Sequence, residues 1–230
     1  GLKPLKTYLD KVEQVATKED YLALTAQLYA KGIQAPISVY TSLDGKNSSV
    51  YALSLSQSGL SLGNRAYYLE DNPQYQEFRD KYLELMTDIF KMLQLHQCKE
   101  REAAQKTFEM ETRMAQIHRS PVQLRDSERN YNKKTMAELN QLTFNVDWSK
   151  YFKDLGLNKE VDYVIVNQPE FLAMEGDSGN NPHAEQCHTK SKLCFLPNHI
   201  EWSGRGVSAL ADCTEFYGHK FRATLGKALC

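Results

Sequence analysis

The sequence predicts a mainly α-helical fold with one small β-hairpin. Apolar residues recur every three or four positions in several long stretches, which is the spacing of one helix face. Between residues 37 and 55, β-branched and aromatic residues instead flank a turn, which is typical of two paired strands. The chain has 230 residues, of which 41% are hydrophobic and 25% charged. These values are typical of a globular protein with one or two domains.

Residues 1–32 are predicted to form two helices. The second begins at Thr17-Lys-Glu-Asp20, where the threonine side chain can cap the free backbone donors of the first turn. Its apolar residues then lie largely on one side, and Gly32 is a favoured residue just past a helix end.

The predicted hairpin pairs residues 37–43 with residues 49–55. Both segments are rich in β-branched and aromatic side chains. Asp44-Gly45-Lys46-Asn47 lies between them and supplies residues that tolerate the positive φ of a tight turn.

Two long helices are predicted next. Apolar residues from Tyr75 to Leu93 step by three or four, and those from Ala103 to Ile117 do the same before Ser120-Pro121 ends the pattern. The apolar and methionine stripes of these helices indicate core packing rather than a cofactor site.

Shorter elements follow. Thr135-Met-Ala-Glu138 predicts the capped start of a short helix, and Asp147 begins another that ends at Gly156. Residues 161–166 are predicted to form a short strand.

The charge pattern narrows the possible partners. The net charge is −1, and no basic block is present, so neither nucleic acid nor an anionic membrane surface is an expected partner. No apolar run reaches the roughly 18 to 20 residues that span a bilayer. Gly1–Asp10 lacks the apolar stretch of a secretory signal, and we expect the chain to start partway into a longer protein.

Two candidate sites fall in the C-terminal quarter, where the helical pattern is lost. Gly176-Asp-Ser178-Gly179 is similar to the segment around the nucleophile of trypsin-like proteases, but four residues in a glycine-rich stretch recur by chance. A zinc site is the second candidate, although the spacing lacks the tight pairs of structural zinc sites. Its candidate ligands are His183, Cys187, His188, Cys194 and His199. The five cysteines, four of them in the last 44 residues, do not form a whole-chain disulfide framework.

Other catalytic signatures are missing. The sequence contains no phosphate-binding G-x4-G-K-[ST] loop, no G-x-G-x-x-G turn and no H-E-x-x-H, since none of the six histidines precedes a glutamate. The abundant helical carboxylates are expected to form solvated faces. Examples are Glu100, Glu102, Glu109 and Glu111.

Gln57–Leu69 and other segments in the same order resemble the neprilysin, endothelin-converting enzyme and bacterial oligopeptidase family of zinc metallopeptidases. Residues 57–69, Gln57-Ser-Gly-Leu60-Ser-Leu62-Gly-Asn-Arg65-Ala-Tyr67-Tyr68-Leu69, are similar to the family's Q-x-G-L-x-L-P-x-R-x-Y-Y-L. Gly63-Asn64 replaces the Pro-Asp of many members at a turn. The other similar segments are Gly1–Leu5, Glu111–Ala115, Arg125-Asp126, Tyr131–Lys133, Thr135–Leu139, Asp147-Trp148, Tyr151-Phe152 and Val166–Phe171.

The resemblance implies the N-terminal, non-catalytic part of a two-lobe fold, incomplete in this chain. In the family, zinc is held by the two histidines of H-E-x-x-H and a later glutamate, in a part of the protein beyond this chain. We therefore assign no catalytic, cofactor-binding or metal residue here, and expect zinc only in the intact enzyme. Peptide substrates and the catalytic lobe of the same protein are the implied partners, and an extracytoplasmic location is implied as well.

Three segments are predicted along the chain: a helical lobe over 1–173, an irregular segment over 174–213, and a short family-like segment over 214–230. The last contains Glu215-Phe-Tyr-Gly218, similar to the family's F-x-F-Y-G. A match that is lost and regained suggests a reading-frame error. One permissible set of codons for 175–196, read in a shifted frame, yields strings similar to the family's.

Three functions are therefore considered. The favoured hypothesis is a fragment or frameshifted product of a zinc metalloendopeptidase, inactive by itself. A free-standing helical binding module is the first alternative, and a small zinc-binding protein that uses the cysteine- and histidine-rich tail is the second. We also expect the helical part to expose apolar surface that the missing half would cover, leading to aggregation or partial folding.

Overall fold

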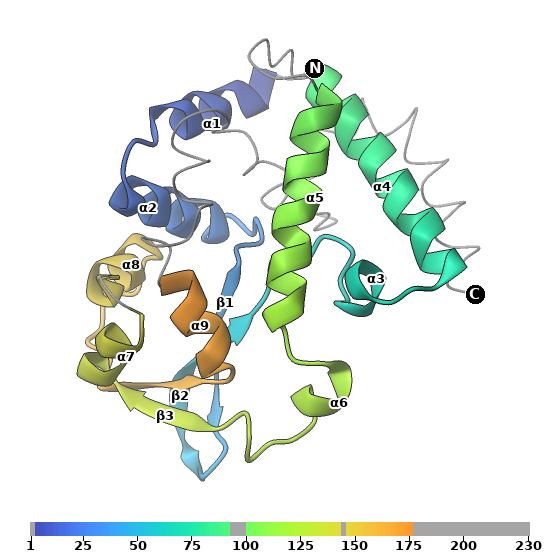
Figure 1. Cartoon of the computed structure of the whole chain (residues 1–230). Coiled ribbons are helices and arrows are strands. Elements are labelled where there is room, and N and C mark those ends of the chain that lie inside the picture. The colour runs from blue at the N-terminus through green and yellow to red at the C-terminus, as the bar shows by residue number, and fades with distance from the viewer. Residues whose placement is uncertain (1–2, 93–99, 144–145, 177–230) are drawn as a thin grey trace.

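The computed structural model describes residues 3–92, 100–143 and 146–176. In this part of the chain, runs of helices are separated by a strand pair and by single strands (Figure 1). In chain order they are α1 (Lys3–Gln14), α2 (Lys18–Tyr29), β1 (Ile37–Asp44), β2 (Asn47–Gln57), α3 (Ala66–Leu69), α4 (Pro73–Met92), α5 (Glu100–Ile117), α6 (Pro121–Leu124), β3 (Asn132–Thr135), α7 (Met136–Leu142), α8 (Trp148–Asp154), β4 (Tyr163–Val166) and α9 (Pro169–Gly176). The predicted mainly α-helical fold with a β-hairpin is confirmed.

The hairpin belongs to a mixed four-stranded sheet in the order β1-β2-β4-β3. β1 and β2 are antiparallel, β2 and β4 are parallel, and β3 and β4 are antiparallel. The strand predicted over 161–166 is confirmed as β4. Strand β3 was not predicted, and the sheet is therefore larger than the sequence pattern indicated.

The hairpin turn differs from its prediction in one respect. Gly45 is not among the glycines with positive φ. Instead, the Asp44 carboxylate accepts the backbone N–H of Lys46 at 2.9 Å, which shapes the turn with a side chain. The same carboxylate accepts the hydroxyls of Tyr131 and Tyr163 at 2.8 and 2.9 Å. Asp44 thus links the hairpin turn to β4 and to the residue just before β3.

The predicted helix boundaries are confirmed where their capping residues are polar or glycine. Thr17 and Thr135 each form a capping box with the third residue of the following helix. Gly32 and Gly156 follow α2 and α8 with φ of 83° and 90°, so a residue without Cβ reverses the chain at each helix end.

The main core lies where the helices cover the sheet. Side chains of β2 and β4 pack there against α2, α7, α8 and α9, and α9 lies across the sheet in Figure 1. Trp148, Phe171 and Leu55 are among its largest fully buried side chains. A second cluster joins α4 and α5, which run side by side (Figure 1), through Tyr82, Met86 and Phe90.

Strand β2 runs from the exposed hairpin tip into this core, so a residue from each part of the strand gives a direct test of the packing. Leu55 has no exposed surface, whereas Tyr51, four residues earlier on the same face of β2, is 72% exposed. We expect Leu55→Ala to lower the free energy of unfolding by about 2 to 5 kcal/mol, because it leaves a cavity. Tyr51→Ala is the matched control and should change it by less than about 0.5 kcal/mol. Urea unfolding of both variants measures the difference, and equal losses would contradict the packing.

Candidate functional site

Three distant segments meet at the end of β2. The side-chain amide of Gln57 accepts the backbone N–H of Arg119 at 2.8 Å and donates to the Arg119 carbonyl at 3.1 Å. The backbone N–H of Gln57 donates to Oε1 of Gln168 at 2.8 Å. These hydrogen bonds join the end of β2 to Arg119, two residues after α5, and to the turn between β4 and α9.

Arg119 is the centre of this junction. Its guanidinium donates through Nε and Nη2 to the two carboxylate oxygens of Glu170, at 2.6 and 2.8 Å. Through Nη1 it donates to the carbonyls of Arg129 and Asn167 and to Oδ1 of Asn130, at 3.0, 2.9 and 3.0 Å. Only 7% of the residue is exposed. A fork of five donors, rather than a single ammonium, suits this set of acceptors.

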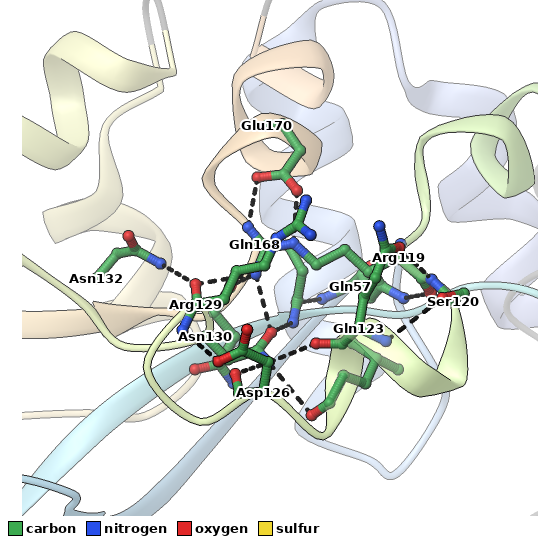
Figure 2. A network of polar contacts seen from close by, with 12 residues as sticks. Gln57, Arg119, Ser120, Gln123, Asp126, Arg129, Asn130, Asn132, Gln168 and Glu170 are labelled. Carbon is green, nitrogen blue, oxygen red and sulfur yellow. Dashed lines mark hydrogen bonds and ion pairs between the residues drawn. The ribbon is translucent and has the colours of Figure 1, made fainter.

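The loop after α5 is held in the same way. Ser120 and Gln123 form a capping box at α6. Asn130 donates through Nδ2 to the carbonyls of Gln123 and Asp126, and its Oδ1 accepts Nε2 of Gln168 at 2.9 Å. Figure 2 shows these side chains converging from α6, the loop behind it and the β4–α9 turn. We call the labelled set the junction network: Gln57, Arg119, Ser120, Gln123, Asp126, Arg129, Asn130, Asn132, Gln168 and Glu170.

The electrostatics of the junction network favour a structural role. Partial burial would raise the pKa of Glu170, but its hydrogen bonds with Arg119 and the nearby positive charges more than offset this, and the net pKa lies below the ordinary value. Glu170 is therefore ionised at neutral pH and paired with Arg119. The guanidinium donates to five acceptors within the protein, which is typical of a structural arginine.

A second polar group lies between α3, α4 and α5. The Glu111 carboxylate accepts the hydroxyls of Ser61 at 2.7 Å, Tyr82 at 2.8 Å and Tyr68 at 2.5 Å. Glu111 is fully buried. Burial raises its pKa to about 7, although these hydrogen bonds act in the opposite direction.

The prediction that Glu111 belongs to a solvated face is wrong. Glu102 and Glu109 are exposed as predicted and Glu100 is half-buried, but Glu111 lies four positions from both Thr107 and Ala115, on the buried side of α5. The signal that reveals it is therefore helix phase rather than residue type.

His118 is the described side chain that most resembles a catalytic base, and its surroundings argue against that role. It is 7% exposed, and its ring packs edge-on against Phe171 at 4.8 Å between ring centroids. Burial lowers its pKa to about 4, so it is neutral at pH 7. Enclosed in the core, it cannot reach a substrate.

The sequence candidates in the C-terminal quarter are not placed. Gly176 ends α9, while Ser178, Gly179 and the histidines and cysteines from His183 to His199 lie outside the described residues. Within 3–92, 100–143 and 146–176, no group of three or more His, Cys, Asp or Glu residues could hold a metal ion. The described residues therefore do not fit a zinc site. In the same ranges no helix has the length and apolarity needed to cross a membrane.

Comparison with known proteins decides the family. A model for the N-terminal part of peptidase family M13 matches residues 1–177. The chain belongs to peptidase family M13. Endothelin-converting enzyme 1 of Mus musculus is 29% identical over 170 residues, which cover 72% of this chain and 21% of that enzyme. The enzyme of Homo sapiens is 28% identical over the same length. This M13 chain thus spans about a fifth of the length of the curated relatives it matches.

Solved structures share the fold. The zinc metalloprotease Zmp1 of Mycobacterium tuberculosis, in complex with an inhibitor, matches with a TM-score of 0.76 at 24% identity, over 96% of this chain and 33% of that chain. PepO from Lactobacillus rhamnosis matches with a TM-score of 0.60 at 14% identity, over 87% of this chain and 30% of that chain. The M13 chain therefore has the fold of the corresponding third of these two proteins.

The M13-like segments have structural roles in this chain. Gln57 and Gln168 join the junction network, and Tyr68 and Glu111, from two different segments, meet in the buried cluster. Arg119 and Asn130 belong to none of these segments, and the sequence analysis missed both. The one sequence clue to Arg119 is its place directly before a helix-ending Ser-Pro pair.

Proposed function

We propose that this chain is part of the N-terminal lobe of a zinc metalloendopeptidase, and that it shapes the peptide-binding chamber without breaking bonds itself. The observation that carries the proposal is the M13 match over residues 1–177. The relatives that share the sequence or fold are named as a converting enzyme and zinc metalloproteases. Hydrolysis of peptides by the intact parent protein follows from that membership.

The described side chains support a non-catalytic role. The charged side chains of Arg119 and Glu111 are buried and hydrogen-bonded within the fold. His118 is enclosed beside Phe171. Catalysis by such a lobe would consist of excluding water and restricting which peptides reach the metal in the other lobe. The proposed lobe consists of residues 1–173, and the proposal does not involve residues 174–230.

The first test is hydrolysis by the chain alone. The purified full chain is incubated at pH 7 with a mixture of fluorogenic peptides, with and without added zinc. We expect no cleavage above the rate in buffer, because the described residues contain no group that could hold a metal ion, and His118 is buried in the core. Chelator-sensitive cleavage by wild type that disappears in Cys187→Ala/Cys194→Ala would contradict the proposal and favour a zinc site in the tail.

The second test asks whether the lobe contributes to a protease. The matching third of Zmp1 is replaced by residues 1–176 of this chain, and the control is Zmp1 lacking that third. We expect the chimera to cleave peptides and the deletion to be inactive, because the open catalytic part would lack its cover. A chimera that folds and retains zinc but is as inactive as the deletion would contradict the proposed role.

A further inference from the structure

The corner between α3, α4 and α5 is built around one ionisable group. Oε1 of Glu111 accepts the hydroxyls of Ser61 and Tyr82, and Oε2 accepts the hydroxyl of Tyr68. Ser61 lies in the segment before α3, Tyr68 in α3, Tyr82 in α4 and Glu111 in α5. One carboxyl group is therefore bonded to every element that meets at this corner.

The surroundings of the carboxyl group are apolar or uncharged. Tyr68 stacks on Phe108 with 5.6 Å between ring centroids, and Tyr82 belongs to the cluster of Met86 and Phe90. The titratable groups that the structure shows facing Glu111 are the phenols of Tyr68 and Tyr82, whose own pKa values burial raises further. They are neutral at all ordinary pH values, and they stabilise a negative charge only through their dipoles.

The neighbouring cations are directed to other partners. Arg65, just before α3, donates through Nε to the Ala115 carbonyl at 3.1 Å. Arg79, on α4, donates to the carbonyls of Tyr67 and Glu70 at 2.8 and 3.2 Å. Both arginines strengthen the same corner through backbone oxygens, whatever the charge on Glu111.

We propose that Glu111 is a proton-controlled latch that holds α3 and α4 against α5 when its carboxyl group is protonated and loosens them when it is ionised. A protonated carboxyl group can donate to the hydroxyl oxygen of Ser61 or Tyr82, and both hydroxyls can turn to accept. Ionisation instead places a negative charge in an apolar interior, and that charge is relieved when the corner opens to water.

The direction of the effect is opposite to that of most carboxylates. The pKa of Glu111 is raised from the ordinary 4.5 to about 7 in the folded protein, because burial outweighs the hydrogen bonds from Tyr68, Ser61 and Tyr82. The folded state therefore holds a proton that the unfolded state has lost. The stability that this group contributes is complete below about pH 4.5 and is lost as the pH rises toward 7.

Urea unfolding of the full chain tests the latch. Wild type, Glu111→Gln and the exposed control Glu109→Gln are compared at pH 5 and pH 8. Between these values we expect the equilibrium constant for unfolding to rise between about 10-fold and 100-fold more in wild type and Glu109→Gln than in Glu111→Gln. A pH dependence in Glu111→Gln equal to that of wild type would overturn the proposal.

Two measurements on wild type keep the test independent of the variant's folding. Carbon-13 NMR should show one glutamate carboxyl group that titrates near pH 7, and glutamates that all titrate below about pH 5.5 would exclude the latch. Amide hydrogen exchange, corrected for its intrinsic pH dependence, should quicken from pH 5 to pH 8 in 61–92 and 100–115 more than in β2 and β4. Equal quickening throughout would indicate global destabilisation instead of a local latch.

Discussion

Arg119→Ala is expected to lower the free energy of unfolding by about 3 to 5 kcal/mol, because it leaves several buried acceptors without a donor. The substitution removes all five side-chain hydrogen bonds of the guanidinium and leaves Glu170 without its partner. The carbonyls of Arg129 and Asn167 also lose a donor in a buried place, which adds a desolvation cost. Since a domain is stable by roughly 5 to 15 kcal/mol, much of the stability of the fold rests on this side chain.

Two further variants isolate the cause. Arg125→Ala removes an exposed arginine from the neighbouring loop and should change stability by less than about 0.5 kcal/mol. Arg119→Lys keeps the charge but lacks the forked donors, and we expect it to recover only a minor part of the loss. Thermal or urea unfolding measures all three, and an Arg119→Ala protein as stable as wild type would show that the junction network is dispensable.

Gly59→Ala is expected to lower the free energy of unfolding by about 2 to 5 kcal/mol, the sum of a conformational and a packing cost. Gly59 has a φ of +88°, where a side chain costs about 1 to 2 kcal/mol. A Cβ at this position would also lie 2.9 Å from the backbone Cα of Pro36 and 2.8 Å from Cε of Met114. Met114 can rotate, but Pro36 can yield only if the chain before β1 moves, which adds the cost of overpacking.

Gly63 provides a control with the same backbone requirement. Its φ is +77°, and a Cβ there would have no atom within 4 Å. Gly63→Ala should therefore lose only the conformational part, about 1 to 2 kcal/mol. Similar losses in the two variants, measured by urea unfolding, would show that the close approach of Gly59 to Pro36 has no energetic importance.

The elements that could be predicted are those specified by local sequence. Two segments rich in β-branched and aromatic residues around a turn predicted the hairpin, and polar caps such as Thr17 and Thr135 predicted helix starts. Strand β3 was missed because Asn132-Lys-Lys-Thr135 has no apolar alternation, and its pairing with β4 is a long-range contact. The parallel pairing of β2 with β4 spans about a hundred residues, and no local pattern specifies it.

The polar centres could be predicted only in part. Gln57 and Gln168 drew attention through their family-like segments, although nothing in the sequence shows that they are bonded to each other. Arg119 looks like any charged residue at a helix end, because the acceptors of its guanidinium come from two distant segments, residues 129–130 and 167–170. Glu111 was misassigned because glutamate is usually exposed, and only its phase on α5 indicates otherwise.

The two polar centres explain how this part of an M13 protein holds its shape. The junction network fixes the sheet to the end of α5, and Glu111 fixes α5 to α3 and α4. Under the proposed function, this lobe would face the catalytic part of the intact peptidase. The proposed function thus assigns structural polar groups to this chain and catalytic groups to another part of the intact protein.

The most direct measurement is the sequence of the coding DNA from codon 165 through several hundred bases past codon 230. The proposal predicts a continuation, in the same or a shifted frame, that carries H-E-x-x-H and a later glutamate for zinc. An intact frame with a stop codon after Cys230 and no such continuation would contradict it, and the free-standing binding module would then be the better account.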